Sequence, residues 1–222
     1  MTVKLSHRQR QAQATRSAAA HAARRLFAAH GYVATTIEGI SEAAEIPVQT
    51  IYSAFSNKPA ILEEIRRLWI AESDVEELHR QALLVADPVQ RLRRAAHWTR
   101  RQLESGYEVI AIHIEAARAD PRVAEVWRRA LSGREAAIRK LLKSMALNLR
   151  PGLSLAQALD IYVAATLPEV YRTLVIERGW SPDRYEGWLG DLLISQIIGK
   201  SWSGRRETSP KYQAGGGIRV SP

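Results

Sequence analysis

Residues 35–62 read TTIEGISEAAEIPVQTIYSAFSNKPAIL. Apolar side chains in this stretch recur at helical spacing on both sides of Glu45-Ile46. The pattern predicts a short helix, a tight turn, a second short helix and the start of a third. The middle helix would carry small and polar side chains outward at its N-terminal end. A helix-turn-helix unit presents such an end to the major groove of DNA, so the stretch favours DNA binding over catalysis.

The surrounding residues extend this unit to a domain of residues 16–62. A first helix is expected from about Arg16 to His30, because its small and apolar side chains share one face. Gly31 follows as a C-terminal cap. Residues 1–15, which are polar and basic, are expected to form a flexible arm ahead of the domain.

Each of the following helices has a recognisable start. Thr35 and Glu38 have the spacing of a capping box for the second helix. Pro47 stands where the first turn of the third helix tolerates proline. Ser56-Asn57 should end that helix and cap the next one.

The positive charge of the 222-residue chain, net +9, is uneven. Residues 1–62 hold seven Lys/Arg and three Asp/Glu, whereas residues 63–202 hold 21 and 19. A basic N-terminal segment suits a module that binds phosphates. The chain has no cysteine for disulfides or thiolate zinc sites, and no apolar run long enough to span a membrane. The N-terminus lacks a secretory signal, so a soluble cytoplasmic protein is expected.

Residues 63–202 predict a larger helical domain, which makes the fold class all-α. The expected helices are Pro59 to about Leu84 (one long helix or a kinked pair), Asp87 to about Glu104, Tyr107–Ala119, Arg122 to about Leu149, Ser154–Arg178 and Pro182–Gly199. Ser105-Gly106 should break the second of these from the third. Residues 203–222 contain three consecutive glycines and few apolar residues, and predict a disordered tail.

The third helix of the N-terminal domain supplies the candidate base contacts. Ile51 and Phe55 should face the core, which leaves Val48, Gln49 and Tyr52 on the open side. Gln can pair bidentately with adenine, and Val can pack on a thymine methyl group. Lys58 should lie beside free backbone N–H groups that attract phosphate. The candidate DNA-binding residues are Thr36, Val48, Gln49, Thr50, Tyr52, Ser53 and Lys58.

These residues carry a resemblance: residues 16–62 resemble the DNA-binding domain of the tetracycline-repressor (TetR) family of bacterial transcription regulators. That family tends to show a helix ending in G-[YF], then T-T-[IV], then A-G-V-S-x-x-T-[IL]-Y-x-[HY]-F-x-[SN]-K-x-x-[LI]. The matching residues are Gly31-Tyr32, Thr35-Thr36-Ile37, Ala44, Thr50-Ile51-Tyr52, Phe55, Asn57-Lys58 and Ile61-Leu62.

Three positions depart from the family pattern. Glu45 replaces the turn glycine, and a left-handed backbone there would cost about 1–2 kcal/mol, so the turn is expected to shift instead. Pro47 replaces a serine that usually caps the recognition helix. Ala54 replaces an aromatic residue or His, which removes one expected phosphate contact.

The resemblance also implies a homodimer whose last two long helices, here Ser154–Arg178 and Pro182–Gly199, form a four-helix bundle between protomers. An apolar stripe on the second of them agrees with this. The candidate dimer-interface residues are Ile161, Ala165, Val170, Trp188, Leu189, Leu192, Leu193, Gln196 and Ile197. The same stripe can instead pack within one chain, and both interpretations remain open.

Aromatic side chains with a few polar groups predict a small-molecule cavity in the C-terminal domain. The candidate ligand-binding residues are Trp98, Tyr107, His113, Trp127, Tyr162 and Tyr171. For each of them the alternative is a place in the ordinary core. His113 lies in an apolar run and suits a hydrogen-bonded core histidine.

The sequence therefore predicts a transcriptional regulator, most simply a repressor that a small-molecule effector releases from a double-stranded, palindromic DNA operator. No Gly-rich phosphate loop, G-x-S-x-G or H-E-x-x-H motif is present, so no enzyme, cofactor or metal is expected. The alternative is a DNA-binding scaffold that a protein partner controls and that has no ligand pocket.

Overall fold

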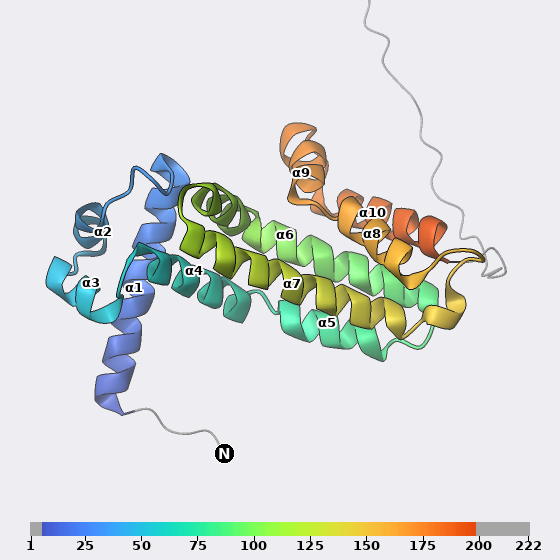
Figure 1. Cartoon of the computed structure of the whole chain (residues 1–222), viewed down its shortest axis with the longest axis horizontal. Helices are drawn as coiled ribbons and strands as arrows, with labels where there is room; N and C mark the ends of the chain where they lie inside the picture. Colours follow the sequence, from blue (N-terminus) through green and yellow to red (C-terminus); the bar gives the residue numbers. More distant parts are fainter. Residues whose placement is uncertain (1–5, 199–222) are drawn as a thin grey trace, which may run out of the picture.

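A computed structural model of the chain describes residues 6–198, and over that range it confirms the predicted all-α class. The N-terminal helices are α1 (His7–His30), α2 (Ile37–Ala44) and α3 (Val48–Ala54). The C-terminal elements are α4 (Lys58–Glu72), α5 (Val75–Leu84), α6 (Pro88–Ala119), α7 (Pro121–Lys143), the 3-10 turn η1 (Ala146–Asn148), α8 (Leu155–Ala165), α9 (Pro168–Tyr171), the π-helical η2 (Arg172–Glu177) and α10 (Pro182–Ile197). Figure 1 shows α1–α3 at one end of an elongated helical body.

The small N-terminal unit has its own apolar centre. Phe27 of α1, Ile40 of α2, Ile51 of α3 and Phe55 are all buried, as their spacing predicts. Arg16 adds a polar link, since its guanidinium donates to the Ala54 carbonyl, stacks on the Phe55 ring and pairs with Glu64 of α4. The helix-turn-helix is therefore packed on α1 and anchored to α4.

α1 begins at His7, so the prediction of a flexible arm over residues 1–15 is wrong for the part that the structure describes. Ser6 caps the helix, because its hydroxyl accepts from the Gln9 backbone N–H while the Gln9 side chain accepts from the Ser6 N–H. Neither proline nor glycine interrupts the residues that follow, so residues 7–15 form an N-terminal extension of the predicted first helix, and most of it is exposed. Residues 1–5 lie outside the described range.

α4 and α5 are the kinked pair that one of the sequence alternatives predicted. The chain turns at Ser73-Asp74, where Asp74 has a left-handed backbone with φ 53°. α6 is continuous from Pro88 to Ala119, so the expected break at Ser105-Gly106 is absent.

Gly106 serves packing rather than helix termination. A Cβ atom at Gly106 would lie 2.1 Å from ring atoms of Trp69 on α4. The neighbouring Ser105 hydroxyl donates to the Arg101 carbonyl and accepts from the Trp69 indole N–H. The glycine thus lets the indole lie directly on the α6 backbone.

The expected helix Ser154–Arg178 is divided in two. α8 begins directly after the predicted cap, Ser154, but ends at Ala165, and Pro168 begins a separate segment. Proline has no N–H to continue the hydrogen-bond ladder, and it disfavours helical backbone in the residue before it. Figure 1 shows α9 projecting away from the α8–α10 layer, so the long straight bundle helix is not formed.

α10 packs along α6 and closes the body of the protein. Leu189, Leu193 and Ile197 have no exposed surface, because they are enclosed within the single chain. For these three residues the intramolecular alternative holds, and their assignment to a dimer interface is wrong. Trp188, Leu192 and Gln196 on the same helix remain partly exposed.

The predicted tail, residues 203–222, and the last expected helical residue, Gly199, lie outside the described residues. Between residues 6 and 198 we find no helix whose length and apolar character would let it cross a membrane.

Candidate DNA-binding face and effector cavity

The turn between α2 and α3 contains Glu45 in a left-handed backbone conformation with φ 55° and ψ 35°. The expected shift of the turn is therefore wrong. Glu45 adopts the left-handed conformation itself, at an energetic cost that glycine would not have. The Ser41 hydroxyl supports the turn by donating to the Ile46 carbonyl at 2.6 Å. The N-cap of α2 is Thr36, whose hydroxyl accepts from the Gly39 N–H, and the predicted Thr35 capping box is wrong. Thr35 instead donates to the Gly31 carbonyl.

Five of the seven candidate DNA-binding residues are exposed on one end of the molecule. Val48, expected on the open side, is half-buried at the first position of α3. Tyr52, a large aromatic residue, is 50% exposed. The exposed five are Thr36, Gln49, Thr50, Tyr52 and Ser53.

Lys58 has a different role from the predicted phosphate contact. Its ammonium donates to the carbonyls of Tyr32 at 2.7 Å, Thr35 at 3.0 Å and Val33 at 3.5 Å. It also lies 4.3 Å from the centre of the Tyr32 ring. Burial lowers the pKa of Lys58, and the nearby Asp120 carboxylate partly opposes that shift. The three donors are thus engaged in fixing the loop between α1 and α2.

Replacing Lys58 with Met should therefore destabilise the protein rather than only weaken phosphate binding. Losing the charged donor that serves these carbonyls is expected to lower the free energy of unfolding by about 1–3 kcal/mol. Urea denaturation measures the change. Lys140→Met is the control, since Lys140 is exposed on α7. An unchanged unfolding midpoint for the Lys58 variant would contradict the structural role.

The junction between the two parts of the chain consists of specific polar contacts. Arg24 of α1 pairs with Glu108 of α6 at 2.7 Å. Glu115, about two turns further along α6, accepts from the Tyr32 backbone N–H at 2.9 Å. Tyr32 follows Gly31, whose φ is 82°. Sequence reasoning missed this contact, because a lone carboxylate in a helix carries no signal of a partner 83 residues away.

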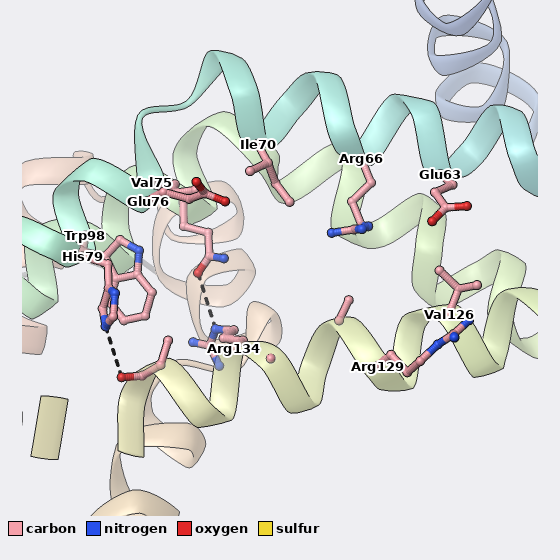
Figure 2. A pocket seen from close by; sticks show the side chains of 14 residues that line it. Glu63, Arg66, Ile70, Val75, Glu76, His79, Trp98, Val126, Arg129 and Arg134 are labelled. Atoms are coloured by element: carbon pink, nitrogen blue, oxygen red, sulfur yellow. Dashed lines mark hydrogen bonds between the residues drawn. The ribbon is translucent and has the colours of Figure 1, made fainter. Parts of the chain in front are cut away.

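The C-terminal domain contains two adjoining pockets, which share lining residues and which we call the outer and inner lobes of the cavity. The outer lobe, about 530 Å³, lies between α4, α5, α6 and α7 (Figure 2). The inner lobe, about 350 Å³, also reaches α8 and α9. The two share the lining residues Arg66, Ile70, Gln102, Ala130 and Arg134. Trp69, Ile110, Trp127 and Val163 give the inner lobe apolar walls.

The six predicted ligand residues divide between the cavity and the core. Trp98 lines the outer lobe and Trp127 the inner lobe, and Tyr107 borders a smaller surface cavity of about 190 Å³. His113, Tyr162 and Tyr171 are buried in the core.

Each of these buried residues has core partners. The Tyr162 hydroxyl donates to the Ala95 carbonyl and shares a hydrogen bond with Thr99. Tyr171 lies edge-on to Tyr185. His113 donates from Nδ1 to the Val109 carbonyl and stacks on Trp127, and burial lowers its pKa to about 4. The imidazole is therefore neutral near pH 7.

Sequence reasoning missed the polar groups that distinguish the cavity, namely Arg66, Gln102 and Arg134. Each stands in a charged, helical stretch where a solvent-exposed face is the ordinary interpretation. Within residues 6–198, no cluster of His, Asp and Glu side chains could hold a metal ion.

Comparisons with known proteins agree with this geometry. Residues 20–65 match the family model described as bacterial regulatory proteins, tetR family. No curated protein matches. Solved structures with the same fold include NalD, the secondary repressor of the MexAB-OprM multidrug efflux pump in Pseudomonas aeruginosa (21% identity, 87% of this chain and 100% of that chain, TM-score 0.68).

Two further structures hold ligands. One is a transcriptional regulator from Saccharomonospora viridis in complex with choline (19% identity, 85% and 100% coverage, TM-score 0.68). The other is FadR from Bacillus subtilis in complex with stearoyl-CoA (18% identity, 82% and 98% coverage, TM-score 0.67).

A helix-turn-helix at one end of a helical body that carries a cavity is the architecture of a DNA-binding transcriptional regulator. Residues 20–65 thus match the tetR family model, and the chain as a whole has the fold of regulators of that family.

Proposed function

We propose that this protein binds a pseudo-palindromic DNA operator as a homodimer and that a small molecule in the two-lobed cavity releases it. The observation that carries the proposal is the exposed polar end of α3, bearing Gln49, Thr50 and Tyr52, which is followed directly along the chain by α4, a helix that lines the cavity. The cavity also favours this function over a ligand-free scaffold controlled by a protein partner.

The DNA side of the proposal uses α3 as the recognition helix. Gln49 is the candidate for reading an adenine edge, with the Val48 side chain against a thymine methyl group. Thr36, Thr50, Tyr52 and Ser53 offer hydroxyl groups to phosphates. In a two-fold dimer the two recognition helices would enter successive major grooves about 34–36 Å apart, which requires a palindromic site.

The dimer would form on the open face of α8 and α10. The candidate residues of α8 and α10 that stay partly exposed in the single chain support this surface, and they are Ile161, Ala165, Trp188, Leu192 and Gln196. The remaining candidate, Val170, is also partly exposed but lies on α9. A symmetric dimer buries the same patch on both protomers, so a single apolar face on each chain can form the whole interface.

Coupling between cavity and DNA would run through α4 and α6. Asn57 caps α4 directly after the recognition helix, and Arg66 and Trp69 on the same helix line the cavity. Glu115 on α6 holds the Tyr32 backbone at the other junction. A ligand that favours one placement of these helices must change operator affinity by the same factor as the operator changes ligand affinity.

Gln49→Ala tests the DNA-binding role. Selection of bound duplexes from a random pool would first identify the operator, which should be a pseudo-palindrome. The variant is then expected to lose about 1–3 kcal/mol of operator binding and to relax preference at one base position per half-site. Gln90→Ala is the control, since Gln90 is exposed near the start of α6, at the opposite end of the molecule (Figure 1).

A selected site without two-fold symmetry would rule out the proposed dimeric docking. Equal loss on every sequence after Gln49→Ala would assign that side chain to the phosphate backbone instead.

A further inference from the structure

Two arginines in the cavity lack the carboxylate partners that several other arginines of the described chain have. Arg67 pairs with Glu64 and Arg100 with Glu186 and Glu104, for example. Within residues 6–198, by contrast, Arg66 and Arg134 form no ion pair, although both line both lobes. Figure 2 shows Arg66 projecting from α4 and Arg134 from α7 into the same gap.

Arg134 is held in place by neutral groups only. Its guanidinium donates to the Thr166 hydroxyl at 2.7 Å and, at 3.4 Å, to the Gln102 side-chain oxygen and the Thr166 carbonyl. Burial lowers the pKa of the Arg134 guanidinium, but an arginine side chain remains protonated in proteins. A charge that is desolvated and bonded only to neutral acceptors gains most from an anion.

Arg66 lacks a hydrogen-bond acceptor as well as an ion-pair partner. Its Nε atom is buried and has no hydrogen-bond partner. His113, whose pKa the Arg66 charge helps to lower, is neutral near pH 7 and so adds no second positive charge beside Arg66. An acceptor oxygen in the gap would satisfy this N–H and would face Arg134 as well.

The remaining lining of the cavity sets the rest of the ligand's character. The carboxylates that border it, Glu63, Glu76 and Glu135, are exposed, and Glu135 pairs with Arg139. Beyond the arginines the inner lobe is apolar, with Trp127, Val163 and Leu167 among its walls. A binding site with two cationic groups at one end and apolar walls at the other suits an amphipathic anion.

We infer that the effector is an organic anion with an apolar body, whose carboxylate lies between Arg66 and Arg134 and whose hydrocarbon or aromatic part lies along the inner lobe. The regulatory role of this ligand rests on the proposed function, but its binding to the cavity can be measured without DNA.

Calorimetric titration of the full-length protein with three probes that share an unbranched ten-carbon chain tests the inference. The probes are decanoate and decyltrimethylammonium, each below its micelle concentration, and 1-decanol below its solubility limit, so that the head group is the main difference. Decanoate is expected to bind at least about tenfold more tightly than either other probe, because charge-assisted bonds to two guanidinium groups add to the same apolar contact.

The matched variants are Arg134→Gln and Arg139→Gln, which lie on the same helix. Arg134→Gln should remove the preference for decanoate and leave 1-decanol binding unchanged. Arg139→Gln should change neither, since Arg139 is exposed and paired with Glu135. If Arg134→Gln does not fold, Arg66→Gln supplies the same comparison.

The outcomes separate the two claims. No decanoate binding, equal binding of the three probes, or a persistent decanoate preference in the folded variant would overturn the inference. Selective decanoate binding that leaves operator affinity unchanged would uphold the anion site and contradict the proposed switch.

Discussion

Replacing Leu193 with lysine is expected to unfold the protein rather than to separate two protomers. Leu193 has no exposed surface in the single chain and lies where α10 packs on α6. The change removes a buried leucine and places an ammonium in an apolar site, so we expect a loss of at least about 4 kcal/mol. That loss is a large part of the roughly 5–15 kcal/mol that stabilise a typical domain.

The neighbouring residue provides the control for this prediction. Leu192 is partly exposed on the same helix, and Leu192→Lys should leave the chain folded. If the open face of α8 and α10 is the dimer surface, that variant should also sediment as a monomer. Thermal melting followed by circular dichroism reads the first effect, and sedimentation velocity reads the second. A folded, monomeric Leu193→Lys protein would show that Leu193 belongs to the interface after all.

The contrast between Leu192 and Leu193 shows what the sequence determines. Apolar residues at three- and four-residue spacing identify a helix and its apolar face, but the pattern does not tell whether the partner is α6 or a second chain. The helix-turn-helix is more predictable because its signals are local. Ile40, Ile51 and Phe55 occupy the core that their spacing indicates, and Asn57 caps α4 as expected.

The candidate site is less predictable because its decisive contacts join distant parts of the chain. Lys58 looks like a free basic group at a helix start, yet the carbonyls that bind it come from the loop before α2. Arg134 looks like a surface residue of α7, yet Thr166 and Gln102 surround it. Only the three-dimensional arrangement shows which of the 32 Lys and Arg side chains are buried without forming an ion pair with a carboxylate.

Gly106 is the position where a small change should have the second large effect. By helix propensity alone, Gly106→Ala would stabilise α6 by about 0.5–1 kcal/mol. The added Cβ would instead meet the Trp69 ring at 2.1 Å, and that ring is buried and bound through its N–H to Ser105. Displacing the indole should outweigh the propensity gain, for a net loss of at least about 2 kcal/mol in urea denaturation.

Gly133→Ala separates packing from propensity, since Gly133 lies within α7 and a Cβ there would meet no atom within 4 Å. This control should be neutral or slightly stabilising. Combining Gly106→Ala with Trp69→Leu should recover part of the loss, because Trp69→Leu removes the ring with which the new Cβ atom would clash. If Gly106→Ala alone proves stabilising, the indole does not lie on the α6 backbone. Because Trp69 also lines the inner lobe, the same displacement should weaken binding of any ligand held there.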